Sequence, residues 1–166
     1  MRLKLFLIIS ALVSIILIIA GCAAPKCPDL NEAAPDFTLE NPEGQEISLS
    51  DFKGKTIILN FWATWCGPCQ LEMPFFQAIY EERADDGLIV MAVDVMENAS
   101  SVGRFVSDME LTFPVLLDTN AKVARQYCLP QALPATLFID EEGIIRAGKV
   151  GAFIDQQEIE DILDSI

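Results

Sequence analysis

Two cysteines separated by two residues, Cys66 and Cys69, lie just after a mostly apolar run at positions 56–62. A continuous apolar run is typical of a strand that is covered on both faces of a sheet. Pro68 fits the first turn of a helix, because the N–H that proline lacks has no partner there in any case. The pattern therefore predicts a buried strand, a short turn and a helix that begins near Cys66.

A cysteine at such a strand-to-helix junction has the surroundings of a redox thiol. The helix N-terminus offers partial positive charge and unpaired N–H groups, which stabilise the nucleophilic thiolate. Cys69, one turn further along, is expected to be the less exposed thiol and close enough to form a disulfide with Cys66. Two alternatives stay open, a pair of buried structural thiols and a zinc site. Zinc would want four ligands, and the chain has one such pair and no histidine.

The rest of the chain alternates between strand-like and helix-like segments. Strands are predicted at 36–39, 45–49, 56–62, 88–95, 113–118, 135–140 and 144–150, and helices at 66–84, 100–109, 120–127 and 155–166. A Pro/Gly turn at 41–44 favours a β-hairpin between the first two strands, and 51–55 is expected to form a turn. The order indicates an α/β fold, with a mixed central sheet flanked by helices on both sides.

The N-terminus has the pattern of an export signal. Arg2 and Lys4 precede an apolar stretch at 5–20, as in a secretory signal peptide. The segment 19–22 resembles the bacterial lipobox, and this resemblance implies a diacylglycerol on the Cys22 sulfur after cleavage behind residue 21. The alternative is an uncleaved signal anchor, since about 20 apolar residues span a membrane. In either case the domain would lie outside the cytoplasmic membrane.

These patterns divide the chain into three parts. We expect a lipoprotein signal peptide at 1–21, a flexible tether at 22–34 and a folded domain at 35–166. The tether assignment follows from its prolines and its mixed small and polar residues. Cys27, within this tether, is expected to be incidental or an occasional disulfide partner.

The composition limits the function classes. Asp and Glu number 25 against 11 Lys and Arg, which gives a formal net charge of −14. Without a basic patch, a nucleic acid is not an expected partner. The acidic residues either cover a solvated face or favour docking to basic surfaces. Because the chain has no histidine, acid–base work must fall to carboxylates, thiols, tyrosine, lysine or water.

Several motifs together resemble a known family. The segment 61–69 closely resembles the active-site segment of thioredoxins, Pro74 matches the proline that kinks their active-site helix, and 133–140 resembles their cis-proline loop. Three further segments look like those of the membrane-tethered TlpA/ResA branch, namely 34–39, 49–55 and 113–118. The match extends from about residue 34 to the C-terminus. It implies a thioredoxin fold with an added N-terminal β-hairpin.

The resemblance also implies a mechanism and a third catalytic residue. Cys66 would attack a substrate disulfide, and Cys69 would then release the reduced substrate. Thioredoxins carry a buried Asp in the preceding strand, where this chain has Asn60, which cannot accept the proton of the inner thiol. Members of the branch often place a Glu three residues after the second cysteine, and Glu72 matches it. The alternative is that Glu72 is a plain exposed helix residue.

Substrate contacts are expected on both sides of the cysteines. Leu133 and Pro134, the latter after a cis peptide bond, would bind the substrate as an added strand. Trp65 would shape the docking surface together with Gly67 and Pro68. The Gly-Pro pair is the one found in thioredoxin, which favours a reductant. The family then implies a membrane electron donor of the CcdA/DsbD type and, as one task of this branch, reduction of apocytochrome c thiols.

Cys128 has two possible roles, and two rival functions fit the same motifs. Cys128 is either a third redox thiol near the proline loop or a small buried apolar residue, which is the more common case. No cofactor is expected beyond the Cys66–Cys69 disulfide. One rival function is a non-catalytic binding lipoprotein on the same fold. The other is a peroxiredoxin-type peroxidase, disfavoured because Thr64 stands two residues before Cys66, where that class needs Thr-x-x-Cys.

Overall fold

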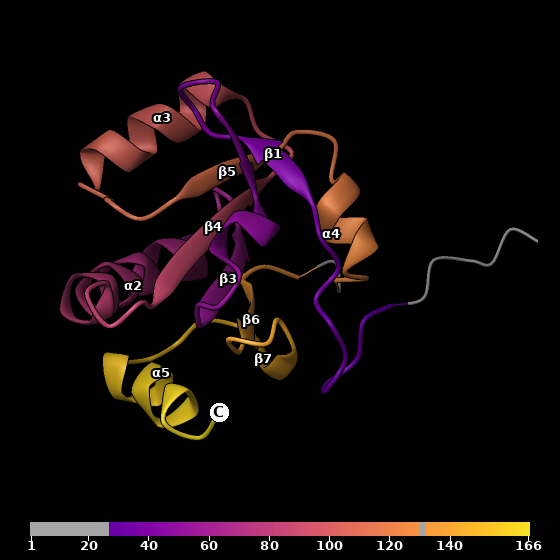
Figure 1. Ribbon diagram of the computed structural model, residues 1–166. Helices are drawn as coiled ribbons and strands as arrows, with labels where there is room; N and C mark the ends of the chain where they lie inside the picture. The colour runs from indigo at the N-terminus through magenta and orange to yellow at the C-terminus, as the bar shows by residue number, and fades with distance from the viewer. Residues whose placement is uncertain (1–26, 130–131) are drawn as a thin grey trace, which may run out of the picture.

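The computed structural model describes residues 27–129 and 132–166, and its centre is a seven-stranded mixed sheet (Figure 1). The strands are β1 (Thr38–Glu40), β2 (Glu46–Ser48), β3 (Ile57–Trp62), β4 (Ile89–Val95), β5 (Val115–Asp118), β6 (Ala135–Ile139) and β7 (Ile145–Val150). Their order across the sheet is β2-β1-β5-β4-β3-β6-β7. The central strands β3, β4 and β5 pair in parallel. The pairings further out are all antiparallel, namely β5 with β1, β1 with β2, β3 with β6 and β6 with β7.

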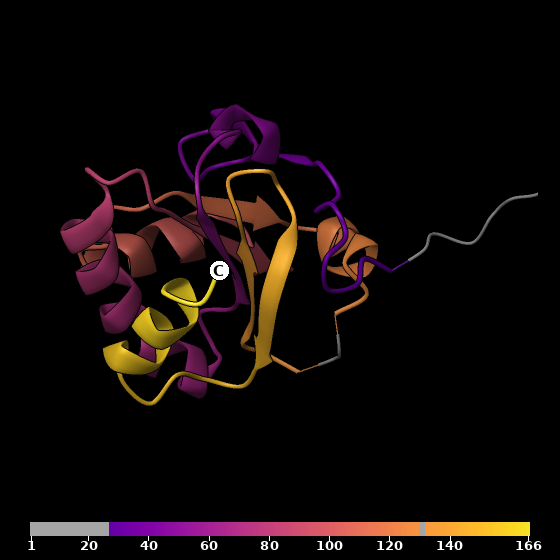
Figure 2. The same cartoon turned by 60° about the horizontal axis from the view of Figure 1, so that its bottom comes forward.

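Helices cover both faces of this sheet. They are η1 (Leu49–Phe52, a 3₁₀ helix), α2 (Gly67–Arg83), α3 (Ala99–Asp108), α4 (Lys122–Gln126) and α5 (Gln156–Leu163). Helices α2, α3 and α5 lie on one side of the sheet, and α4 lies on the other side (Figures 1 and 2). Side chains of α2, α3 and α5 belong to one core cluster, and side chains of α4 and η1 belong to a second cluster. The predicted mixed sheet with helices on both faces is confirmed.

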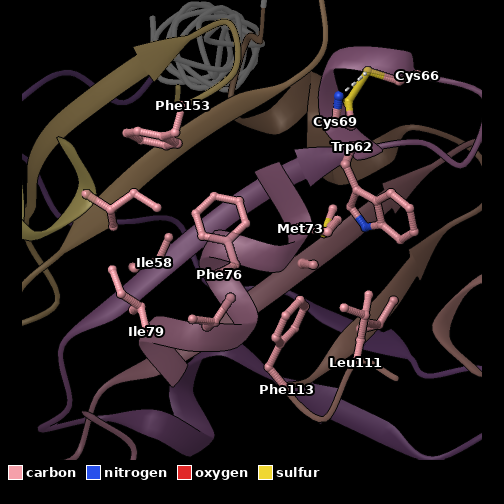
Figure 3. Close-up of a cluster of buried hydrophobic side chains, with 14 of the residues drawn as sticks. Ile58, Trp62, Cys66, Cys69, Met73, Phe76, Ile79, Leu111, Phe113 and Phe153 are labelled. Carbon is pink, nitrogen blue, oxygen red and sulfur yellow. Dashed lines mark hydrogen bonds between the residues drawn. A yellow bond between two sulfur atoms is a disulfide. The ribbon is translucent and has the colours of Figure 1, made fainter. Parts of the chain in front are cut away.

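The packing of α2 on the sheet positions the cysteine pair. Every residue of β3 is buried, as the apolar run predicted. Figure 3 shows Met73 and Phe76 of α2 in the same cluster as Ile58 and Trp62 of β3. All four side chains are fully buried, and replacing a buried Phe such as Phe76 by Ala typically destabilises a protein by about 3–5 kcal/mol. This packing holds the N-terminus of α2 at the carboxyl end of β3.

Several element boundaries differ by a few residues from the sequence-based prediction, and the differences at η1, α4 and α5 are the ones with a local explanation. The last residue of the expected second strand and the first part of the expected turn lie in η1, whereas residues 53–55 form a turn as predicted. Helix α4 is shorter than predicted because Ala121 adopts a left-handed conformation with φ 53°. Helix α5 begins one residue later than predicted, because Asp155 is its N-cap and its side chain accepts a hydrogen bond from the N–H of Glu158.

The prediction of a flexible tether is wrong for residues 27–34. The N–H of Asn31 donates to the carbonyl of Ile145 at 2.7 Å, and the N–H of Ala34 donates to that of Gly143 at 2.9 Å. Cys27 forms a disulfide with Cys128. This segment is therefore fixed to the domain by backbone hydrogen bonds and a covalent bond.

The interpretation of Cys128 as a buried apolar residue is also wrong. Cys128 is exposed, lies just after α4 and has a positive φ of 49°. Its disulfide partner Cys27 is exposed as well and precedes it by 101 residues. The bond thus joins two distant segments at the surface, which composition alone could not indicate.

The predicted signal peptide at 1–21 and the lipidation residue Cys22 lie outside the described residues. Within 27–129 and 132–166, no helix is both long enough and apolar enough to cross a membrane.

Candidate active site

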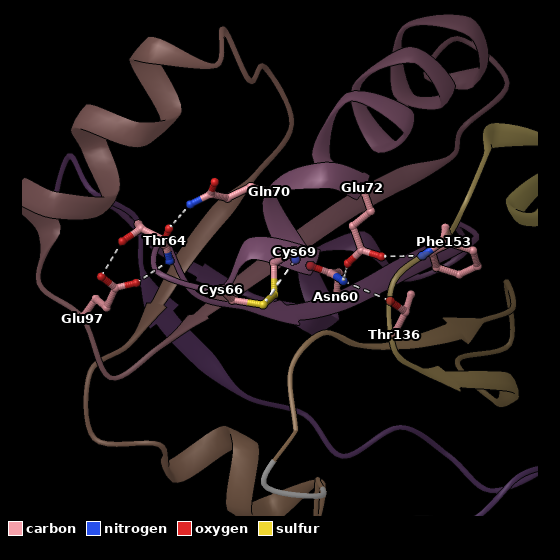
Figure 4. Close-up of a disulfide and its surroundings, with 9 residues drawn as sticks. All are labelled: Asn60, Thr64, Cys66, Cys69, Gln70, Glu72, Glu97, Thr136 and Phe153. Atoms are coloured by element: carbon pink, nitrogen blue, oxygen red, sulfur yellow. Dashed lines mark hydrogen bonds between the residues drawn. A yellow bond between two sulfur atoms is a disulfide. The ribbon is translucent and has the colours of Figure 1, made fainter.

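Cys66 and Cys69 form a disulfide at the N-terminus of α2 (Figure 4). Cys66 is the N-cap residue, and its Sγ accepts a hydrogen bond from the N–H of Cys69 at 3.2 Å. The exposed fraction is 5% for Cys66 and 0% for Cys69, so Cys69 is the less exposed of the two, as predicted. In the reduced state the same N–H and the helix dipole would favour a thiolate on Cys66.

The predicted substrate-binding residues lie at the same edge of the sheet. Gly67 and Pro68 form the exposed first turn of α2. Pro134 follows a cis peptide bond from Leu133, as expected, and directly precedes β6. Because β6 pairs with β3 in the register Phe61↔Ala135, Pro134 lies beside the strand end from which the cysteine turn departs.

Trp65 projects from this turn. Its exposed fraction is 71%, which is high for so large an apolar side chain. Trp62, three residues earlier, is fully buried against Phe105 with ring centroids 4.9 Å apart. One tryptophan therefore belongs to the core and the other to the surface next to Cys66.

Glu72 is completely buried, so the alternative of a plain exposed helix residue is wrong. Its Oε1 accepts a hydrogen bond from Asn60 Nδ2 at 2.9 Å, and its Oε2 accepts one from the backbone N–H of Phe153 at 3.0 Å (Figure 4). Asn60 also donates to Thr136 Oγ1 at 3.0 Å. Residues from β3, β6, α2 and the segment before α5 thus hold this carboxyl in place.

Burial raises the pKa of Glu72 to about 7, against the opposing effects of the Phe153 and Asn60 hydrogen bonds. A carboxyl with this pKa can both accept and donate a proton near neutral pH. Glu72 lies three residues after Cys69, so the two side chains share a face of α2. The geometry suits an acid–base group for the inner thiol.

Some residues of the site could not be predicted. The Phe153 contact is made by a backbone N–H, which has no sequence signature. Glu97, two residues after β4, binds Thr64 of the cysteine turn, and Asp94 of β4 accepts a hydrogen bond from the N–H of Glu97. Only the position of these two carboxyl groups near the carboxyl end of an apolar strand could have indicated them. Among the described residues, no three side chains of the metal-binding types gather where a metal ion would fit.

Comparisons with known proteins agree with this geometry. A model of the AhpC/TSA family matches residues 30–148. The chain belongs to this thioredoxin-like family. The thiol-disulfide oxidoreductase ResA of Bacillus cereus is 35% identical over 86% of this chain and 82% of its own length. The predicted family and the thioredoxin fold are therefore confirmed.

Solved structures give the same result. StoA from Bacillus subtilis superimposes with a TM-score of 0.66 at 30% identity, covering 78% of this chain and 98% of its own. The pneumococcal exposed lipoprotein thioredoxin Etrx1, from Streptococcus pneumoniae, gives a TM-score of 0.69 at 28% identity, covering 80% and 100%. Sequence and structure together identify a thiol-disulfide oxidoreductase.

Proposed function

We propose that this protein reduces disulfides in other proteins at the outer face of the cytoplasmic membrane, with Cys66 and Cys69 as its redox pair. The observation that carries the proposal is the position of the Cys66–Cys69 disulfide at a helix N-terminus, with the buried carboxyl of Glu72 one turn behind the inner sulfur. This arrangement supplies a stabilised thiolate, a resolving thiol and a proton acceptor.

The reaction proceeds in two exchanges. The Cys66 thiolate attacks one sulfur of the substrate disulfide, which breaks that bond, forms a mixed disulfide and leaves the other substrate sulfur as a thiolate. Glu72 then takes the proton of Cys69. The Cys69 thiolate attacks the Cys66 sulfur, which releases the second substrate thiolate. The substrate gains two electrons, and the Cys66–Cys69 disulfide is restored.

The substrate would dock across the exposed edge around Cys66. Trp65, Gly67 and Pro68 are exposed there and can contact a partner surface. The backbone next to the cis bond between Leu133 and Pro134 can pair with an extended segment of the substrate, in the manner of an added strand.

The resemblance to the family supports a direction of electron flow and a source of electrons. The Gly67-Pro68 dipeptide is the one found in thioredoxin, which has a reduction potential of about −270 mV. This low potential favours a reductant. An enzyme outside the membrane must be reduced again after each cycle, for which a membrane electron donor of the CcdA/DsbD type is suited. Apocytochrome c thiols are one class of client that fits this branch.

A lipid on Cys22 would hold the domain at the membrane. The lipobox-like segment before Cys22 and the similarity to Etrx1, which is described as an exposed lipoprotein, support this assignment. Metabolic labelling with a radioactive fatty acid tests it, with Cys22→Ser as the matched control. Label that persists in the Cys22→Ser protein would contradict the assignment.

The exchange activity is tested with insulin reduction. The wild-type protein should reduce insulin disulfides with dithiothreitol as electron source, and Cys66→Ser should not. A Cys69→Ser variant should trap mixed disulfides with its clients in native membranes. Equal insulin reduction by wild type and Cys66→Ser would favour the non-catalytic binding lipoprotein, and consumption of hydrogen peroxide at the expense of dithiothreitol would favour the peroxidase.

A further inference from the structure

The turn between β3 and α2 is held by a carboxylate from the segment that follows β4. Both oxygens of Glu97 bind the same residue, Thr64, which lies two residues before Cys66. The backbone N–H of Thr64 donates to Oε2 at 2.5 Å, and its hydroxyl donates to Oε1 at 2.6 Å (Figure 4). Glu97 is itself two residues beyond the end of β4, so this contact ties the cysteine turn to the neighbouring strand.

The remaining polar group of Thr64 is also bound. Its carbonyl accepts a hydrogen bond from Gln70 Nε2 of α2 at 2.6 Å. Within the turn, the N–H of Cys66 donates to the carbonyl of Ala63 at 3.1 Å. Thr64 is thus fixed from both sides, and the exposed Trp65 and the N-cap Cys66 are placed by a backbone with little freedom to move.

A second carboxyl supports Glu97 from inside the protein. Asp94 is fully buried in β4, and its Oδ1 accepts a hydrogen bond from the N–H of Glu97 at 3.2 Å. Its Oδ2 is buried and has no hydrogen-bond partner among the described residues. A buried carboxylate oxygen without a partner is costly, whereas a protonated one can direct its O–H towards the Glu97 carboxylate.

The charges around Asp94 favour its protonated form. Asp118 approaches it from β5, and Glu97 from the segment after β4. No lysine or arginine forms an ion pair with Asp94 or Glu97 within the described part of the chain. Burial, followed by the interactions with Glu97, raises the pKa of Asp94 to about 8. The pKa of Glu97 is lowered, because the hydrogen bonds from Thr64, together with the interaction with Asp94, outweigh the effect of its partial burial.

We propose that Glu97 is a positioning residue for the nucleophile Cys66, and that Asp94 holds Glu97 against Thr64 by sharing a proton with it. Neither carboxyl touches the reacting sulfurs. The inference rests on the proposed exchange at Cys66. We call the contacts of Glu97 with Thr64, supported by Asp94, the clamp; it holds the turn before Cys66 and depends on the shared proton. Below about pH 8 the carboxyl pair carries one negative charge and the clamp holds; above it both groups are ionised and repel each other, so the turn loosens.

Two substitutions of Glu97 separate the clamp from its charge. Glu97→Gln can keep both contacts, since its carbonyl accepts from the Thr64 N–H and its amide can donate to the Thr64 hydroxyl. Glu97→Ala loses both. We expect kcat/KM for insulin to fall about tenfold in Glu97→Ala and to stay within about twofold in Glu97→Gln and in the exposed control Glu43→Gln. Thermal unfolding, measured in parallel, identifies any loss of folded protein.

The pH dependence distinguishes the proton-sharing role from a merely structural one. The ratio of kcat/KM in wild type to that in Glu97→Gln should be flat from pH 6.5 to 7.5 and should fall severalfold by pH 9.5. Asp94→Asn, which cannot ionise, should likewise keep its activity at high pH. The pH dependence of alkylation by iodoacetamide gives the thiolate fraction of Cys66 in each protein. The kcat/KM values are divided by this fraction, so that ionisation of Cys66 itself does not affect the comparison with either variant.

Three results would overturn the proposal. These are a flat ratio across the whole pH range, a Glu97→Ala protein as active as wild type, and a folded Glu97→Gln protein as impaired as Glu97→Ala. If the wild type itself fails to reduce insulin, the proposed exchange activity is contradicted. The proposed role of Glu97 in positioning Cys66 for that exchange is then contradicted as well.

Discussion

The two disulfides of the described chain make the same bond in opposite surroundings. Cys66–Cys69 closes a loop with a sequence separation of 3 and is buried at a helix N-terminus, next to the acid–base candidate Glu72. Cys27–Cys128 spans 101 residues, is exposed, and joins the N-terminal segment to the residue after α4. The sulfur chemistry is the same in both, so any difference in role has to come from the surroundings.

Loop length explains why one bond suits exchange and the other suits stability. In the chain-entropy model, a disulfide that closes about 100 residues stabilises a fold by about 4.7 kcal/mol, and a bond across one helical turn stabilises it far less. Opening Cys66–Cys69 in every catalytic cycle therefore leaves the fold nearly as stable as before. Opening Cys27–Cys128 would remove most of that stabilisation and leave residues 27–34 attached to the domain by backbone hydrogen bonds alone.

The largest effect should come from removing the nucleophile. Cys66→Ser should lower the rate of insulin reduction by on the order of a thousandfold or more, because serine cannot form the mixed disulfide. Stopped-flow or turbidity assays measure this rate. In the matched double variant Cys27→Ser/Cys128→Ser, assayed where it is folded, the rate should be close to that of wild type. A comparable loss in the double variant would mean that both disulfides exchange electrons.

The second effect concerns stability, for which Cys27–Cys128 should matter more than Cys66–Cys69. Cys27→Ser/Cys128→Ser should lower the free energy of unfolding by about 2–5 kcal/mol, since the unfolded chain regains the entropy of the large loop. Urea unfolding under oxidising conditions measures it. The control Cys66→Ser/Cys69→Ser should lose clearly less. Equal losses in the two double variants would show that loop length does not explain their difference.

The third effect concerns the acid–base group, which the second disulfide lacks. Glu72→Gln should slow the resolution of the mixed disulfide by about 10- to 100-fold, because general acid–base catalysis contributes at least that much. The pKa of Glu72 is raised to about 7, so in wild type the resolution rate should rise as the pH passes through 7, where the carboxylate becomes able to accept a proton. That rise should be absent in Glu72→Gln, and quenched-flow trapping of the mixed disulfide measures both proteins. An unchanged pH profile would exclude Glu72 as the proton acceptor.

Much of this comparison was accessible from the sequence, but only for one of the two disulfides. The pair Cys66 and Cys69 is local, since the apolar strand before it and Pro68 within it define a strand, turn and helix over a short span. The bond between Cys27 and Cys128 depends on the path of the chain over 101 residues, which no local pattern encodes. The surroundings of Glu72 likewise depend on Phe153, whose backbone N–H binds its carboxyl group from a segment 81 residues further along the chain.

The smallest effect should come from the surface beside the active disulfide. Trp65 is 71% exposed next to Cys66, and Leu30 is 56% exposed three residues from Cys27, so the two side chains form a matched pair of exposed apolar residues. If substrates dock only at the active disulfide, Trp65→Ala should raise KM for insulin about three- to tenfold with little change in kcat, as expected when an aromatic contact of about 1 kcal/mol is lost. Leu30→Ala should change neither constant. A rise in KM for Leu30→Ala as large as that for Trp65→Ala would extend the docking surface to the second disulfide. If KM changes in neither variant, Trp65 is not part of the docking surface, and substrate binding depends on the other exposed groups around Cys66, such as the backbone beside Pro134.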